Sequence, residues 1–146
     1  MRRERETRHQ APQGLSEDKK KRIESIIVHD DADALVKFAE EIGVCLANGE
    51  ISKGQFRNLF DSIKRIEMEG GFSRRKLVML KPRMEHAISR VSGISRVSGR
   101  QKKEIMGELR DVLSFAIDKV EDDPRRFERF VEFFEAILCY HGAKMR

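Results

Sequence analysis

Residues 123–138 read DPRRFERFVEFFEAIL, and this stretch decides the fold class. Large apolar residues recur in it every three or four positions, the spacing of one face of an α-helix, at Phe127, Phe130, Val131, Phe134, Ile137 and Leu138. Asp123 carries a side chain that caps free backbone N–H groups, and Pro124 suits the first helical position, where no N–H is needed. The stretch therefore predicts an amphipathic helix that buries a row of aromatic rings.

Four further segments show the same helical spacing, at residues 31–48, 52–69, 73–91 and 101–120. Asn48-Gly49 is expected to end the first of them, because Gly adopts the left-handed conformation that closes many helices. Ser52 and Gln55 form a capping box at the start of the second. Gly70-Gly71 is expected to end it.

Pro82 interrupts the segment 73–91 and leaves two alternatives. Either the helix continues with a kink, because proline lacks the N–H that bonds back four residues, or one helix ends and another begins with Pro82 near its first turn. The Arg-Val-Ser-Gly repeat that follows, at residues 90–99, is rich in Ser and Gly and predicts a loop.

No segment alternates apolar and polar residues as a strand does, so the predicted fold is all-α, a compact bundle of about five helices. Residues 31–146 are expected to form this single helical-bundle domain. Residues 1–30 are expected to be poorly ordered. They comprise a disordered basic tail, because residues 1–15 offer almost nothing to bury, and a possible short helix in residues 16–28.

The charge of the chain is uneven along its length. The 146 residues carry 30 Lys and Arg against 25 Asp and Glu, a net charge of +5. Residues 71–110 alone hold eleven basic and three acidic side chains, a net charge of +8. Such a segment attracts polyanions, including nucleic acids. The alternative is the solvated surface of a charge-rich protein.

Composition also excludes several classes of protein. The longest apolar run, residues 136–140, is far shorter than the roughly 20 residues that cross a bilayer. A secretory signal has an apolar segment after its charged start, and the charged start of this chain is followed by none. Two cysteines do not make a disulfide framework. We expect a cytoplasmic protein with no membrane contact.

Acidic clusters at residues 30–33 and 121–123 are candidate sites for a divalent metal that assists phosphodiester cleavage. Each cluster lies directly before a predicted helix, where carboxylates cap N–H groups and face the positive end of the dipole, so we favour capping. Cys45 and Cys139 lack zinc-site spacing and are expected to be small buried apolar residues. We predict no catalytic residue, no metal and no cofactor.

Basic residues border the apolar faces of two successive helices. At about 100° per residue, Lys53, Arg57 and Lys64 lie along one edge of the helix at 52–69. Basic residues seven positions apart form a similar line on the segment 73–91, at Lys76, Arg83 and Arg90. If Pro82 restarts that helix, only the last two stay aligned. Such edges could follow a phosphate backbone, and the alternative is that the stems cover apolar surface while the charges stay in water.

Phe133 and Tyr140 lie seven residues apart and are displaced from the main apolar face of the last helix, with Arg126 on the same line. They either widen the buried face or contact a partner or another copy of the chain. We favour contact, because apolar surface beyond the core usually marks an interaction site.

Five strings occur in the order of a known family, namely LVKFAEEIG at 35–43, SKGQFR at 52–57, IKRI at 63–66, LVMLKPR at 77–83 and FFEAILCYH at 133–141. Together they resemble the small subunit of type III-A CRISPR effector complexes, the Csm small-subunit family. The resemblance covers about residues 33–144.

This resemblance implies an all-α, non-catalytic protein that stacks in several copies along a ribonucleoprotein and contacts the target strand through basic residues. Taken with the basic helix edges, it assigns RNA contact to Lys53, Arg57, Lys64, Arg65, Lys81, Arg83 and Arg90. The predicted partners are RNA, bound independently of its sequence, the other complex subunits and further copies of the chain.

The predicted function is therefore a scaffold subunit for antiviral defence that contacts the backbone of the target RNA and guide duplex. The alternative is a helical adaptor that binds only proteins, with cations that serve solubility. A metal-dependent nuclease is the least favoured hypothesis.

Overall fold

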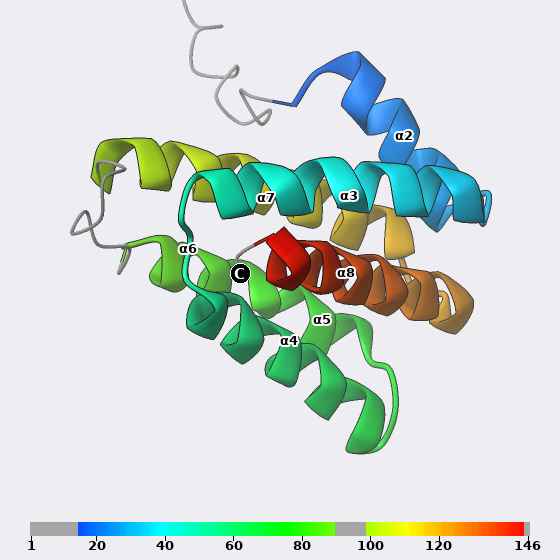
Figure 1. Ribbon diagram of the computed structural model, residues 1–146. Helices are drawn as coiled ribbons and strands as arrows, with labels where there is room; N and C mark the ends of the chain where they lie inside the picture. The colour runs from blue at the N-terminus through cyan, green and yellow to red at the C-terminus, as the bar shows by residue number, and fades with distance from the viewer. Residues whose placement is uncertain (1–14, 90–98, 145–146) are drawn as a thin grey trace, which may run out of the picture.

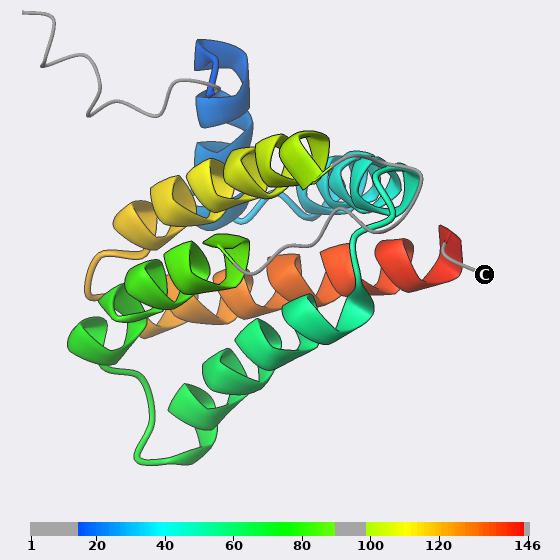
Figure 2. The same ribbon diagram turned by 90° about the vertical axis from the view of Figure 1, so that its left-hand side faces the viewer.

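The computed structural model describes residues 15–89 and 99–144 of the chain, and every regular element within them is a helix (Figures 1 and 2). The helices are α2 (Glu17–Ile27), α3 (Ala32–Asn48), α4 (Lys53–Met68), α5 (Arg74–Val78), α6 (Leu80–Ser89), α7 (Gly99–Val120) and α8 (Pro124–Lys144). The all-α class is confirmed. The number of helices exceeds the expected five because the short helix near residue 20 forms and the segment after Ser73 is divided.

Helices α3 and α8 share the most extensive contact between elements. They run in the same direction side by side (Figure 1), with Phe38 and Phe133 stacked at a ring-centroid distance of 5.9 Å. Farther along, a Cβ atom on Gly43 would lie 2.6 Å from the Cβ of Tyr140. The α3 backbone therefore approaches α8 more closely than any residue with a side chain would allow. Helix α8 also contacts α2, α4 and α7 and lies at the centre of the bundle.

Side chains cap the helices where the sequence predicts. Asp31 accepts a hydrogen bond from the Ala34 N–H at 3.0 Å, and Asp123 accepts one from the Arg125 N–H at 2.9 Å. Ser52 accepts from the Gly54 N–H at 3.1 Å. The Gln55 half of the predicted capping box involves a side chain outside those that the structure describes.

Helix α2 is part of the bundle. Ile23, Ile26 and Ile27 are almost completely buried, and the helix contacts α3, α7 and α8. Arg129 of α8 donates hydrogen bonds to the carbonyl oxygens at the end of α2, to Ile27 at 3.0 Å. Helix α2 therefore packs against helices of the predicted domain, and the domain boundary at residue 31 stays a prediction. The expected tail at 1–15 lies outside the described residues except for Leu15, which is buried.

The left-handed residue that follows α3 is not the glycine that the sequence predicts. Gly49 has φ −81°, and the left-handed residue is Glu50, with φ 59°. Gly49 instead packs closely against α7, because a Cβ there would lie 2.4 Å from Cδ1 of Ile105, whose side chain would have to move. The predicted stop after α4 is confirmed, with Gly70 and Gly71 at φ 85° and 83°.

The segment that begins at Ser73 consists of two helices. Helix α5 ends at Val78, and α6 begins at Leu80, so that Pro82 occupies the first turn of α6. This is the second of the two alternatives for Pro82, and it places the missing N–H where no helical hydrogen bond is lost. The predicted loop lies outside the described residues except for Gly99, which begins α7.

Candidate nucleic-acid interface

A groove runs between α4 on one side and α5 and α6 on the other, and we call it the α4–α6 groove. Its narrow end, of about 250 Å³, is lined by Ser62, Arg65, Ile66, Glu69, Lys76, Met79, Leu80 and Arg83. Its wide end, of about 820 Å³, is lined by Ser52, Gly54, Arg57, Asn58, Leu59, Ser62, Met79, Pro82, Arg83, His86 and Ala87. Ser62, Met79 and Arg83 line both ends, which makes the groove continuous.

Helical spacing places these residues on the two walls. Positions 58, 62, 65 and 69 are three or four apart, so they form one face of α4 and of the turn that ends it. Positions 79, 83 and 86 form the facing line on α6 and the residue before it in the same way. Leu59, Ile66 and Leu80 are buried and anchor both walls to the core.

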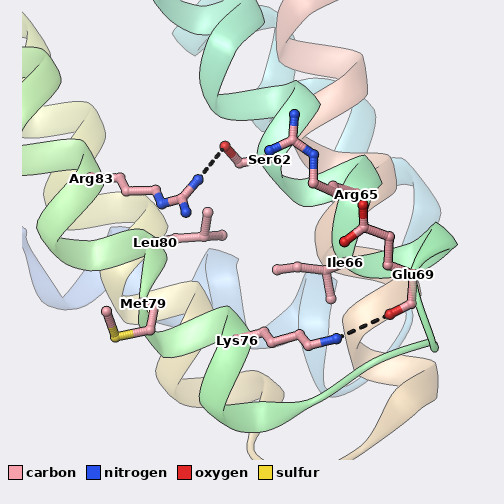
Figure 3. Close-up of a pocket in the computed structure, with 8 residues that line it drawn as sticks. All are labelled: Ser62, Arg65, Ile66, Glu69, Lys76, Met79, Leu80 and Arg83. Carbon is pink, nitrogen blue, oxygen red and sulfur yellow. Dashed lines mark hydrogen bonds between the residues drawn. The ribbon is translucent and has the colours of Figure 1, made fainter.

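Positive side chains converge on the narrow end. Arg65 and Arg83 extend toward each other from the two walls, and Arg83 donates a hydrogen bond to the Ser62 Oγ at 2.9 Å (Figure 3). The Lys76 Nζ donates to the backbone carbonyl of Glu69 at 3.0 Å. Both partners are neutral, so neither cation loses its charge to an ion pair. Among the described lining residues, Glu69 alone is acidic.

Two arginines of the groove have no side-chain partner among residues 15–89 and 99–144. The side chains of Arg57 and Arg65 form no hydrogen bond or ion pair with any residue of the described segments. An arginine without a carboxylate keeps its full charge and its five donors for a ligand. The groove therefore combines four cations of α4, α5 and α6 with one carboxylate.

Many cations on other faces are neutralised by carboxylates within the chain. The pairs are Arg22–Glu41 at 2.7 Å, Lys119–Glu24 at 2.8 Å, Arg110–Glu85 at 3.1 Å, Arg126–Glu121 at 3.4 Å and Arg129–Asp30 at 3.4 Å. Positive potential is thereby reduced on those faces and retained at the α4–α6 groove.

The structure divides the predicted RNA-contacting residues into three groups. Arg57, Arg65 and Arg83 come together in the groove. The side chain of Lys53 and all of Arg90 lie outside the described parts of the structure. Lys64 and Lys81 do not line the groove, because their ammonium groups are paired with Glu67 and Asp118. Basic residues are predicted along the edges of two successive helices, and those that line the groove lie on its two facing walls.

Lys64 lies on the α8 side of α4. Its Nζ is 2.8 Å from Glu67 and 5.9 Å from the centroid of the Phe60 ring, and Phe60 in turn contacts Phe134 of α8. The hydrogen bond to Glu67 raises the pKa of Lys64. Lys81 reaches α7, where its Nζ is 2.7 Å from the Asp118 carboxylate. Both ammonium groups are thus partly neutralised, away from the groove.

Lys76 and His86 line the groove but are missing from the predicted contact set. Lys76 carries a sequence signal, since it lies seven residues before Arg83. The signal for His86 is its position three residues after Arg83, which places it on the same helical wall.

The predicted partner-contact residues have different surroundings. Phe133 is completely buried and stacks on Phe38, so within the chain this side chain widens the buried face of α8, the alternative to the partner contact predicted for it. Tyr140 is half-buried and packs against the core beside Gly43. Arg126 donates to the Lys119 carbonyl at 2.9 Å. Partner contact through Tyr140 and Arg126 stays a prediction.

The acidic clusters serve as helix caps, through Asp31 and Asp123. Within residues 15–89 and 99–144, no three His, Cys, Asp or Glu side chains gather as a metal site requires. The expected burial of the cysteines is wrong, because Cys45 and Cys139 are both exposed and reduced. Desolvation of the thiol, followed by the charge of Glu108, raises the pKa of Cys45, which makes it a weak nucleophile.

A known protein family matches the part of the chain from α3 to α8. The family model described as Csm2 Type III-A matches residues 29–145. The chain belongs to this family. Csm2 proteins are structural subunits of the type III-A CRISPR complex, so the chain is a subunit of such a complex and its partners include the other Csm subunits. The resemblance inferred from the five sequence strings is confirmed.

The Csm2 match begins after α2, which lies outside the family pattern. No curated protein and no solved structure matches the chain. The described helices include none with the length and apolar character that a bilayer crossing requires.

Proposed function

We propose that the chain is a non-catalytic scaffold subunit that binds RNA through the α4–α6 groove, independently of sequence. The observation that carries this proposal is that Arg57, Arg65 and Arg83 line one groove and form no ion pair with any residue of the described segments. Phosphate contacts position a protein on a strand without reading its bases, and guide pairing supplies the sequence in a CRISPR complex. The ligand is the backbone of target RNA or of the guide duplex, and the setting is antiviral defence in the cytoplasm.

Copies of the chain stack along the complex and leave their grooves free to follow the strand. Tyr140 and Arg126 contact a neighbouring subunit in this arrangement. Catalysis has no part in the role, because the acidic clusters that could assist cleavage cap helices instead. RNA cleavage then belongs to other subunits of the assembly.

Replacing Arg57, Arg65 and Arg83 together with Ala tests the proposal. We expect binding of a short single-stranded RNA to weaken for every sequence tried. The slope of log affinity against log salt should fall by about two, because each neutralised phosphate on a single strand contributes about 0.7. Fluorescence anisotropy over a salt series measures both quantities.

The matched control removes three exposed cations from other faces, Lys21, Lys37 and Arg125. This control variant loses the same three positive charges as the groove variant. It should change the slope of log affinity against log salt much less than the groove variant does. Equal losses in the two triple variants would mean that net charge alone attracts RNA and would reject the groove. Loss of binding to the other subunits, with RNA binding unaltered, would favour the protein-binding adaptor.

A further inference from the structure

The two ends of the α4–α6 groove differ in chemistry. The narrow end gathers Arg65, Lys76 and Arg83 in about 250 Å³, which suits a compact anion. The wide end measures about 820 Å³, within the range of about 300–1,000 Å³ typical of small-molecule sites. A backbone-binding surface needs only the first kind of site, so the wide end calls for another explanation.

Apolar groups form much of the wide end. Leu59, Pro82 and Ala87 contribute side chains from both walls, and Met79, which is 54% exposed, lies at its junction with the narrow end. A phosphate would gain nothing from these groups, since an anion placed on apolar surface loses hydration without compensation. A flat, weakly polar ring would bury its faces there.

Polar groups at the rim of the wide end suit the edge of a nucleobase. Asn58 and His86 line it and are exposed, and an amide and an imidazole each offer a donor and an acceptor. Arg57 adds a planar guanidinium, and such planes stack on bases as aromatic rings do. The arrangement provides stacking and edge contacts without a fixed pattern that would select one base.

On the basis of the proposed function, we infer that the α4–α6 groove holds a phosphate of the strand at its narrow end and an unpaired nucleobase of the same strand at its wide end. A base within a duplex is stacked on its neighbours and cannot enter a lateral hollow, whereas an unpaired base can be splayed out. Arg83, which lines both ends, contacts the backbone between the two subsites.

Three ligands that share one ribose-phosphate strand test the inference with the full chain. They are a short single-stranded oligoribonucleotide, the same strand with abasic sites in place of its bases, and the same strand annealed to its complement. We expect the intact single strand to bind about tenfold more tightly than either of the others, the effect of stacking one base. The abasic strand controls for flexibility, because only its bases are missing.

Ala87→Leu fills the wide end and should abolish this preference while it preserves the salt slope. Ala32→Leu, at an exposed position that begins α3, is the matched control and should preserve the preference. Equal binding of all three ligands, still lost in the Arg57, Arg65 and Arg83 triple variant, would overturn the nucleobase subsite and leave the proposed function intact. Failure of every ligand to bind would overturn both.

Discussion

Gly43 determines how closely α3 approaches α8. A Cβ atom at this position would meet the Cβ of Tyr140 at 2.6 Å and the backbone N of His141 at 2.9 Å. The second of these contacts involves backbone, so it cannot be relieved by a change of rotamer. The buried face of α8 depends on this approach, because Phe133, seven residues earlier, stacks on Phe38 of the same helix pair.

Gly43→Ala should therefore lower the free energy of unfolding by about 2 kcal/mol, the cost of forcing extra atoms into a packed interface. Gly107→Ala is the matched control, because its Cβ would meet only the flexible Arg110 side chain at 3.6 Å. That variant should gain up to about 1 kcal/mol from helix propensity. Urea denaturation followed by circular dichroism measures both changes, and a gain in stability for Gly43→Ala would contradict the contact.

Individual cations show where sequence reasoning about the site succeeds and where it stops. Helical spacing identifies Arg57 and Arg83 as edge residues, and both line the groove. Lys81 enters the predicted set through the family resemblance, which does not reveal that its charge is paired with the carboxylate of Asp118, 37 positions away. The partner of Lys64 lies only three residues on, so that pair is visible in the sequence.

At the scale of the element, local chemistry predicts helix starts better than it predicts packing. Asp31, Ser52 and Asp123 accept hydrogen bonds within the turn that they begin, so the sequence alone specifies these caps. Helix α2 is different, because its apolar residues are buried by packing against α3, α7 and α8. The spacing of apolar residues within the segment does not reveal those partners. For this reason the sequence alone predicts a poorly ordered helix there.

Ile26→Ala tests whether α2 belongs to the core. Ile26 is 1% exposed, so truncation should cost about 2–4 kcal/mol from lost burial and the cavity left behind. A single cooperative urea transition should shift as a whole. Lys21→Ala, on the exposed side of the same helix, should change stability by less than about 0.5 kcal/mol. An equally small change for both variants would make α2 an appendage.

A two-pronged ion pair joins α2 to α3. Arg22 donates from Nη1 and Nη2 to the two carboxylate oxygens of Glu41, at 2.9 and 2.7 Å, and its guanidinium lies 4.3 Å from the centroid of the Phe38 ring. The hydrogen bond from Arg22 lowers the pKa of Glu41. A carboxyl group with a lowered pKa stabilises the fold above its unfolded pKa, and that contribution is lost as the pH falls through its folded pKa.

Glu41→Gln should therefore reduce stability at neutral pH by about 0.5 kcal/mol, since exposed pairs are screened by solvent. The difference from the parent chain should disappear below the folded pKa of Glu41, where the parent carboxyl is also neutral. Urea denaturation over a pH series measures this. Glu40→Gln, at the adjacent exposed position, is the matched control for the loss of a surface carboxylate on α3. A deficit for Glu41→Gln that persists in acid would exclude the ion pair as its cause.

At the scale of the whole molecule, charge of opposite sign occupies different surfaces. The exposed face of α8 carries Glu128, Glu132 and Glu135, which are spaced four and three residues apart. None of these three carboxylates forms an ion pair with a residue of the described segments. The cations of the α4–α6 groove lie between α4 and the segment formed by α5 and α6. A polyanion that approaches the α8 face is repelled, so association at the groove is favoured.

Replacing Glu128, Glu132 and Glu135 with Gln should therefore speed RNA association only at low salt. The stripe acts at a distance, and the Debye length falls from about 30 Å at 0.01 M salt to about 8 Å at 0.15 M. Stopped-flow association rates should converge with those of the parent chain as salt rises, while dissociation rates stay equal because the groove is unaltered. The groove triple variant should show the opposite pattern, with faster dissociation at every salt concentration. An effect of the α8 variant on dissociation would mean that RNA also contacts α8, and the division of the surface by charge would then be wrong.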